Sequence, residues 1–312
     1  MTAQLERMIA AQPAAVRSLA DPALTAPAAD RLAGARRIWL IGTGASLHAA
    51  ELGAAELGAA GHDARWVAAN AFTGSLIRDG DAAVVVTHTG KTAYARRSRR
   101  IALDAGLPLV SVTGPQVDWP EAVRTPVAET SETYTVSYTA ALTVLAQIAH
   151  HLGAPGGGPR AVEAVAGRLY EEPGEVPVPA RAMAIVGPGP WSVTAREGAL
   201  KIREGARILC EGFDPDRLLH GGAVPYTAAD TLLVLQPTAD ADELTTALRH
   251  AAALERIQVA TFSTEAGTGS ALLDQIPMTV RLQRLALRFA RQRGQDADLA
   301  ITGAWADPDL WP

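Results

Sequence analysis

The sequence predicts an α/β protein built from two similar units, each a parallel sheet flanked by helices. One reason is that short β-branched runs alternate with helical patterns along the chain, as in strand–helix–strand units. A second reason is an internal repeat, in which one order of strand, turn and helix occurs twice. A third is the helical spacing of apolar residues over 1–20 and 280–294, which predicts a terminal helix at each end that packs against the units.

The repeat is visible in two pairs of segments. Residues 38–57 (IWLIGTGASLHAAELGAAEL) and 183–202 (MAIVGPGPWSVTAREGALKI) each give an apolar strand, a Gly-x-Gly turn and a helix. Residues 81–114 and 230–263 match in the same way and at nearly the same offset along the chain. The sequence therefore predicts a duplication.

A chain of 312 residues has room for two domains at about 150 residues each. The dense Gly/Pro stretch HHLGAPGGGPR at 150–160 predicts the boundary between them. We therefore expect one domain over 1–155 and a second over 156–312.

The charge pattern argues against nucleic acid as a partner. The net charge is −5 and only 5% of residues are aromatic, whereas phosphate neutralisation needs clustered Lys and Arg. The most basic run, ARRSRR at 95–100, predicts the solvated face of a helix, because Ala95, Ile101 and Ala102 supply an apolar side.

The sequence also predicts a cytoplasmic protein with no membrane segment, metal or cofactor. Cys210 is the only cysteine, which excludes an internal disulfide and favours a reducing compartment. The N-terminus lacks the apolar core of a signal peptide, and no apolar stretch reaches about 18 residues. The histidines show no metal-ligand spacing.

A cluster of hydroxyls follows one predicted strand, in VVVTHTGKTAYARR at 84–97. The tripeptide from Gly90 to Thr92 is typical of an ATP-binding P-loop, but that motif needs a glycine where Val85 stands, so a kinase is disfavoured. Thr87, Thr89 and Thr92 can still donate hydrogen bonds to a smaller anion. The matching loop of the second copy, QPTADA at 236–241, has lost most of these hydroxyls.

The turn from Gly42 to Ser46 is the second candidate anion site. A helix N-terminus offers unpaired amides and about half a positive charge, and ligands of parallel sheets bind at the carboxyl ends of the strands. Both loops would meet there and would suit a monophosphate. On the residues alone, N-capping and turn formation are the commoner roles for such threonines.

The segment EGALKIREGARILCEGFDPDRLLHGG at 197–222 holds the candidates for proton transfer, a carboxylate and a histidine. The spacing of Glu197 and Lys201 predicts an ordinary surface pair on a helix. Glu204 lies within reach of Lys201 and Arg207, so the residues alone favour a solvated salt bridge there too.

Several motifs together resemble the tandem sugar isomerase (SIS) domain family, in particular the isomerase half of glucosamine-6-phosphate synthase and its stand-alone phosphosugar isomerase and deaminase relatives. In chain order they are MIAAQPAAVR (8–17), GTGASLHAA (42–50), THTGKTA (87–93), ETYTVSYTAALT (132–143) and EGALKIRE (197–204). The resemblance covers the full length and implies two tandem three-layer αβα, flavodoxin-like domains.

The resemblance implies a sugar-phosphate ligand. Its phosphosugar-binding positions fall on Gly44, Ser46, Thr87, His88, Thr89, Thr92 and Ser137. His88 replaces a family glutamine, and it could add a charge-assisted bond to phosphate or only fill the space.

The resemblance also implies the catalytic pair. The glutamate that transfers a proton between C1 and C2 falls on Glu204, and the histidine that opens the sugar ring falls on His220. In the family this histidine enters the active site of the neighbouring subunit, so a homodimer is implied. Ile301 stands at the position of the tail lysine that forms an imine, and Thr139 replaces another common lysine. No glutamine-hydrolysing domain precedes the first motif, so amination in the manner of the synthase is not expected.

The sequence thus predicts an enzyme that isomerises, deaminates or deglycates a hexose phosphate or amino-sugar phosphate. The alternative is a non-catalytic sensor, since SIS domains also serve as ligand-binding modules of regulators.

Overall fold

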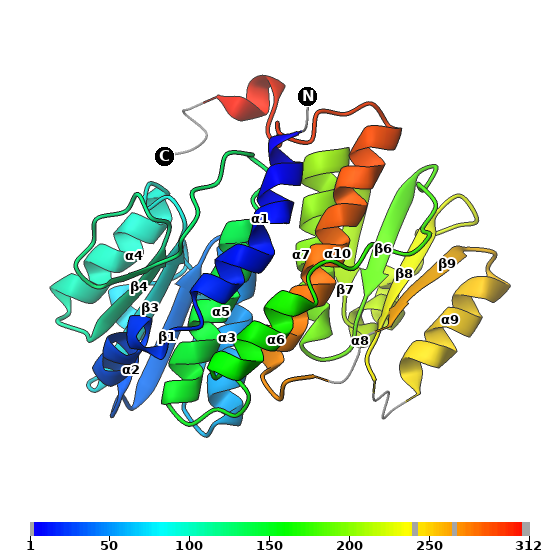
Figure 1. Cartoon of the computed structure of the whole chain (residues 1–312). Helices are drawn as coiled ribbons and strands as arrows, with labels where there is room; N and C mark the ends of the chain where they lie inside the picture. The colour runs from blue at the N-terminus through cyan, green and yellow to red at the C-terminus, as the bar shows by residue number, and fades with distance from the viewer. Residues whose placement is uncertain (1–2, 239–242, 264–266, 308–312) are drawn as a thin grey trace.

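The computed structural model describes residues 3–238, 243–263 and 267–307, and it confirms the predicted fold class. Two parallel sheets lie on the two sides of a shared layer of helices (Figure 1). The first sheet has the strand order β2-β1-β3-β4-β5 and the second the order β7-β6-β8-β9. Over four strands the two orders are the same, whereas the duplication itself stays a prediction.

The helices and strands have the following bounds. The first half contains α1 (Gln4–Ser18), η1 (Pro22–Leu24), α2 (Ala26–Leu32), β1 (Arg37–Gly42), α3 (Ala45–Ala59), β2 (Ala64–Ala68), η2 (Gly74–Leu76), β3 (Asp81–Thr87), α4 (Ala93–Asp104), β4 (Leu109–Thr113), β5 (Ala122–Arg124) and α5 (Val136–His151). The second half contains α6 (Pro159–Gly167), β6 (Ala182–Val186), α7 (Trp191–Ala206), β7 (Leu209–Phe213), α8 (Pro215–Arg217), η3 (Leu218–Gly222), β8 (Thr231–Gln236), α9 (Leu244–Leu254), β9 (Gln258–Ser263), α10 (Ala271–Gln292) and η4 (Gly303–Ala306).

Strand β1 shows how the sequence creates the layers. Its side chains alternate between the two faces of the sheet, as the pleat requires. Ile38 and Leu40 join the large central core, while Trp39 and Ile41 pack in a separate outer core that includes Ala95 of α4. The strand is buried on both faces and therefore reads as a continuous apolar run.

The second sheet repeats this arrangement. Met183 and Ile185 of β6 face the central core, and Ala184 and Val186 face an outer core with Leu248 of α9. Figure 1 accordingly shows α4 and α9 on opposite outer sides of the molecule, with the helices of both halves between the sheets.

The predicted terminal helices both lie in this central layer. α10 packs against α5 and α7, and α1 packs against α5, α6 and α10. The predicted domain boundary falls between α5 and α6. The division into 1–155 and 156–312 remains a prediction.

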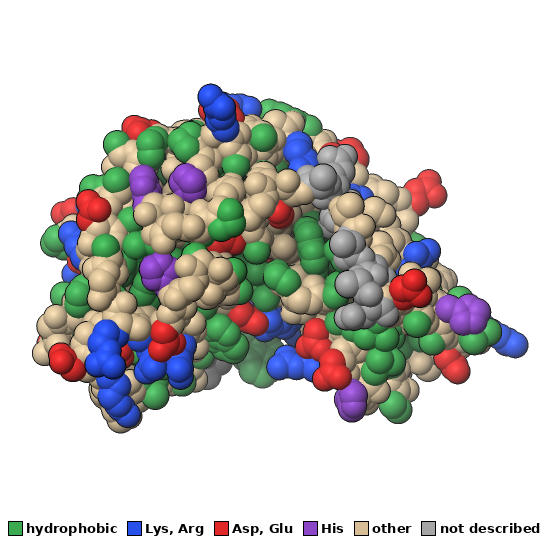
Figure 2. Space-filling view, turned by 90° about the horizontal axis from the view of Figure 1, so that it is seen from below, with side chains coloured by type: hydrophobic (Ala, Val, Ile, Leu, Met, Phe, Trp, Pro, Cys, Tyr) green, Lys and Arg blue, Asp and Glu red, His purple; other side chains and the backbone are tan. Residues whose placement is uncertain are grey.

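Other sequence features can be placed on this fold. In the run at 95–100, Arg96, Arg97 and Arg100 are exposed while Ser98 is buried, as expected for the solvated face of α4. Figure 2, seen from the side opposite the C-terminal tail, shows basic and acidic side chains interspersed. Cys210 is buried in β7, and no described helix is long and apolar enough to cross a bilayer. Positions 239–241 of the loop QPTADA lie outside the described residues.

Candidate active site

A pocket of 560 Å³ opens at the carboxyl ends of β1, β3 and β4. Its walls come from the start of α3, the start of α4, the start of α5, the last turns of α7 and the C-terminal tail. Of the residues predicted for the site, all except His220 line it: Gly44, Ser46, Thr87, His88, Thr89, Thr92, Ser137 and Glu204.

Gly44 makes the sharp turn from β1 into α3. Its backbone angles, φ 56° and ψ −129°, lie in a region that only glycine enters readily. The turn allows α3 to begin at Ala45, so that Ser46 and the first turn of α3 face the pocket. An N-terminal turn in this position favours an anionic ligand.

The threonine loop forms the next part of this wall. Thr87 is the buried last residue of β3, and Gly90, with φ +65°, reverses the chain before α4. Thr89 has the local role that its residue type favours, because its Oγ1 accepts a hydrogen bond from the Lys91 amide at 3.2 Å. Thr92 stands at the N-cap of α4 but makes no side-chain capping bond. Thus N-capping by the side chain does not account for Thr92.

His88 is a neutral part of the wall. Its Nε2 accepts the backbone N–H of Glu129 at 3.1 Å, and its ring packs on Tyr134 with 5.7 Å between centroids. Burial lowers the pKa of His88 to about 4. At neutral pH the His88 ring is therefore uncharged in this structure, and the two roles that the sequence left open stay predictions. Since Nε2 accepts, Nδ1 carries the proton, and this buried atom has no partner in the described part of the chain.

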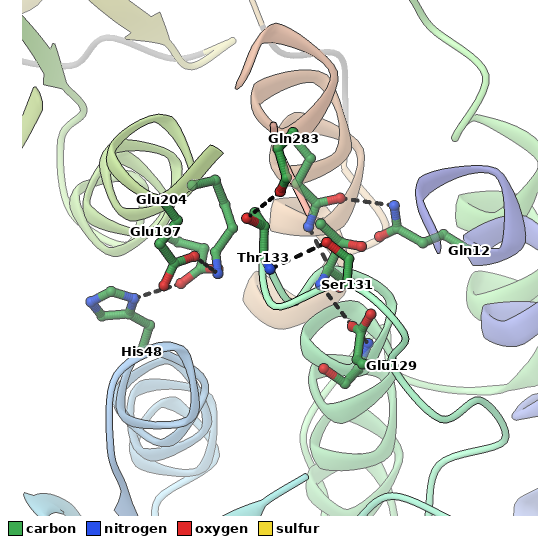
Figure 3. Close-up of polar contacts among 12 residues, drawn as sticks. Gln12, His48, Glu129, Ser131, Thr133, Glu197, Glu204 and Gln283 are labelled. Carbon is green, nitrogen blue, oxygen red and sulfur yellow. Dashed lines mark hydrogen bonds and ion pairs between the residues drawn. The ribbon is translucent and has the colours of Figure 1, made fainter. Parts of the chain in front are cut away.

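The expectation of a surface pair at Glu197 and Lys201 is also wrong. Glu197 is fully buried and Lys201 is 1% exposed, because α7 lies between the second sheet, α10 and α3. Nζ of Lys201 lies 2.6 Å from Oε2 of Glu204 and 3.6 Å from Oε1 of Glu197. Figure 3 shows His48 of α3 directed at Glu197, with 2.7 Å between Nδ1 and Oε2. The helical spacing predicts that these charged side chains are neighbours, but their burial follows only from the packing of α7 against other elements.

The three charges on α7 alter one another's protonation. Burial, together with the charge of Glu197, raises the pKa of Glu204, although Lys201 opposes this. Burial disfavours the charged form of Lys201, yet Glu197 and Glu204 together raise its pKa. Lys201 and His48 lower the pKa of Glu197 in spite of its burial. Lys201 is therefore an ammonium, and Glu204, whose side chain is 25% exposed, is the carboxylate of this row that reaches the pocket.

The C-terminal tail closes another side of the pocket, with Ile301 in its lining. Oε2 of Glu132 accepts the amides of Ala300 and Ile301 at 3.0 and 3.3 Å. Thr133 donates its hydroxyl to the carbonyl of Ala297 at 2.8 Å. The position at which the resemblance places an imine-forming lysine is thus an aliphatic part of the wall.

The same tail is tied to the first helix of the chain. The carboxylate of Asp298 accepts the amides of Gln4 and Leu5 at 2.8 and 2.6 Å, which caps the N-terminus of α1. The two ends of the fold therefore meet, as the red and blue segments at the top of Figure 1 show, and Ile301 of the same tail lines the pocket.

Two further positions lie away from the pocket. Thr139 is fully buried and donates to Oε1 of Gln12. Nε2 of Gln12 in turn donates to Gln283 (Figure 3), so Thr139 belongs to a polar network in the central layer. The side chain of His220 is 76% exposed, and its Nδ1 lies 2.9 Å from the carbonyl oxygen of Asp216. One chain alone does not bring His220 to Glu204.

Sequence reasoning missed Lys201, Tyr134 and Glu132 as lining residues. The motif EGALKIRE contained Lys201, but its burial could not be read from one helix. Within the described ranges, no group of three or more His, Cys, Asp or Glu is placed to hold a metal ion.

The solved structures that are similar to this chain are SIS-domain phosphosugar isomerases and their relatives. One is the tagatose-6-phosphate ketose/aldose isomerase of Escherichia coli, with a TM-score of 0.77 and 17% identity over 96% of both chains. Another is the C-terminal domain of the glucosamine-fructose-6-phosphate aminotransferase of Francisella tularensis, with a TM-score of 0.78 and 16% identity over 96% of this chain and 98% of that one.

A third is the glucosamine-6-phosphate deaminase of Thermotoga maritima, with a TM-score of 0.74 and 15% identity over 95% of this chain and 97% of that one. No family model and no curated protein matches the sequence. At these identities the likeness establishes a shared fold.

Proposed function

We propose that the protein is an enzyme that transfers a proton between C1 and C2 of a hexose phosphate or amino-sugar phosphate. The observation that carries this proposal is that one pocket is lined by Glu204, which has a raised pKa and pairs with a charged Lys201, and by the turn at Gly44 and the threonine loop. The names of the similar structures, two of which act on sugar phosphates by isomerisation or deamination, support the same class.

In this proposal the phosphate lies against the first turns of α3 and α4, where amides and the hydroxyls of Ser46, Thr87 and Thr92 can donate to it. Glu204 then removes the proton from one carbon and returns it to the next, a task that calls for a carboxylate with a raised pKa. The ammonium of Lys201 stabilises negative charge that develops on the neighbouring oxygen.

The reaction proceeds without an imine between enzyme and sugar. The chain has two lysines, Lys91 and Lys201, and only Lys201 lines the pocket. Three carboxylates, Glu197, Glu204 and Glu129, raise its pKa, which keeps the amine protonated and unable to attack a carbonyl. Ile301, which stands at the position of the tail lysine, has no amine.

We further propose a homodimer in which His220 of one copy completes the pocket of the other. His220 is exposed in its own chain, and the neighbouring Leu219 and Val224 are 53% and 83% exposed. Such exposed apolar residues around a histidine suit a contact with a second copy.

The decisive experiment is proton NMR in D₂O with a panel of hexose and amino-hexose 6-phosphates. We expect deuterium to appear at C1 or C2 of one sugar, and Glu204→Gln to abolish this exchange while binding persists. If no sugar exchanges but one still stabilises the protein against heat, the sensor alternative replaces the enzyme.

A further inference from the structure

His48 of α3 is a histidine that the proposed mechanism does not use. Its side chain is 15% exposed, and it is not among the described residues that line the pocket. Its Nδ1 lies 2.7 Å from Oε2 of Glu197, which is fully buried on α7 (Figure 3). An ionised carboxylate only accepts hydrogen bonds, so Nδ1 donates. This bond joins the helix whose first turn lines the pocket to the helix that carries Glu204.

The two ion pairs of Lys201 are unequal. Nζ lies 2.6 Å from Oε2 of Glu204 but 3.6 Å from Oε1 of Glu197. The attraction between opposite charges grows as water is excluded, so the fully buried Glu197 should be the stronger competitor for the ammonium. His48, however, holds the other oxygen of Glu197. The bond from His48 therefore accounts for the longer of the two distances.

The other titratable groups nearby do not replace His48 in this role. Burial and the charge of Glu197 raise the pKa of the phenol of Tyr138 on α5, but its buried hydroxyl has no hydrogen-bond partner in the described part of the chain. Oε1 of Glu197 likewise has none there. The charge of Glu129, in the loop before α5, acts on Lys201. His48 is thus the group whose hydrogen bond fixes the orientation of the Glu197 carboxylate.

We propose that His48 is a positioning residue that holds the carboxylate of Glu197 away from Lys201 and so leaves the ammonium on Glu204. The inference rests on the proposed function, in which Glu204 is the base and Lys201 stabilises charge on the substrate. Without His48, Glu197 would turn toward Lys201 and draw the ammonium inward. Glu204 would then lose the cation that lowers its pKa, and the developing charge on the sugar would lose its counterion.

The test measures the pH dependence of kcat and kcat/KM in His48→Leu, with the sugar phosphate that exchanges deuterium. We expect kcat to fall by about ten- to hundredfold, as for a misplaced catalytic group, and KM to change little because the phosphate subsite is intact. The acid limb should lie at higher pH than in the wild type, the opposite of the shift expected for Glu197→Gln. His48→Asn, whose amide can donate from nearly the position of Nδ1, should recover most of kcat.

A double variant keeps the test decisive if His48→Leu does not fold. In His48→Leu/Glu197→Gln no buried carboxylate has lost its donor. Because the neutral side chain at 197 no longer competes with Glu204 for Lys201, kcat should equal that of Glu197→Gln alone. A double variant much slower than Glu197→Gln would overturn the inference.

Glu51→Gln is the matched control, because Glu51 of α3 pairs with Arg196 of α7 at 2.7 Å and so joins the same two helices. It should leave kcat and the acid limb at their wild-type values. Equal losses of kcat in Glu51→Gln and His48→Leu would reduce His48 to a link between helices and overturn the inference. A wild-type kcat and acid limb in His48→Leu would overturn it while the proposed function stands. If the wild-type protein exchanges deuterium with no sugar, the proposed function fails and the inference fails with it.

Discussion

Nζ of Lys201 and Oε2 of Glu204 lie 2.6 Å apart at the border between the protein interior and the pocket. The lysine is 1% exposed and the glutamate side chain 25% exposed, so one member of the pair is fixed by packing while the other faces a ligand. This asymmetry suggests that Lys201 serves both stability and chemistry, and the two roles can be separated.

Lys201→Met should destabilise the fold strongly, because it leaves the fully buried Glu197 without its cation. Breaking a buried pair in this way costs roughly 3–5 kcal/mol. The double variant Glu197→Gln/Lys201→Met should recover part of that loss, and urea unfolding measures both. Arg17→Met, which breaks the exposed pair with Glu163, should cost no more than about 1 kcal/mol. If Lys201→Met and Arg17→Met lowered the free energy of unfolding equally, burial would not explain the strength of the Lys201 pair.

The acid limb of the pH–rate profile should lie above pH 4.5, since the pKa of Glu204 is raised by burial and by Glu197. Activity would then be lost as the pH falls through that raised pKa and the base becomes protonated. Glu197→Gln removes one of the two causes of the raised pKa of Glu204, so the acid limb of this variant should lie at lower pH than that of the wild type. A limb that does not move in kcat/KM would show that Glu204 is not the titrating group.

His88 should make the fold sensitive to mild acid. Below about pH 6.5 the unfolded chain binds a proton at this residue, whereas the folded protein does so only near pH 4. The free energy of unfolding therefore falls between these values, by roughly 3 kcal/mol in total. In His88→Gln this part of the fall should disappear, because glutamine can accept the Glu129 amide without titrating. If the free energy of unfolding fell in parallel with pH for the wild type and His88→Gln, His88 would not be the group that makes the fold sensitive to acid.

Gly44→Ala should disturb both stability and phosphate binding. A Cβ at Gly44 would meet no atom within 4 Å, so the cost comes from its backbone conformation and should be roughly 1–3 kcal/mol. Gly58→Ala, in the last turns of the same helix, also has free space and should be neutral or slightly stabilising. Chemical denaturation compares the two, and similar effects would mean that the turn at Gly44 is not strained by a side chain.

The proposed dimer predicts complementation between two inactive variants. Glu204→Gln lacks the base and His220→Asn lacks the ring-opening group, so each alone should be inactive on a cyclic sugar phosphate. In a refolded equal mixture, half the dimers are hybrids in which one of two sites is intact, so activity should return to about a quarter of the wild-type value. Failure to recover activity, although hybrids form, would place His220 outside the partner's pocket.

The fold was predictable because its signals are local. The alternation of β-branched strands with helices identified β1, β3, β6 and β8, and the apolar spacing at the two ends identified α1 and α10. Each of these elements carries its pattern in its own residues.

The site was only partly predictable, because its electrostatics depend on packing between distant segments. The carboxyl ends of β1 and β3 could be foreseen as neighbours, so Gly44 and the threonines were placed together. Nothing in the helix from 191 to 206 indicates that α3 and α10 bury Glu197 and Lys201. Likewise nothing in the sequence indicates that the carboxylate of Glu129, a loop residue, accepts the amides at the start of α5.

The tail that ends in the pocket wall also sets the order in which the molecule can be completed during synthesis. α10 fills the central layer and residues 300–301 close the pocket, while Asp298 caps a helix made at the very beginning. A nascent chain that has emerged as far as β9 has all strands of both sheets but lacks α10 and the part of the pocket wall at residues 300–301. The pocket therefore gains its last wall only after nearly the whole chain has been made.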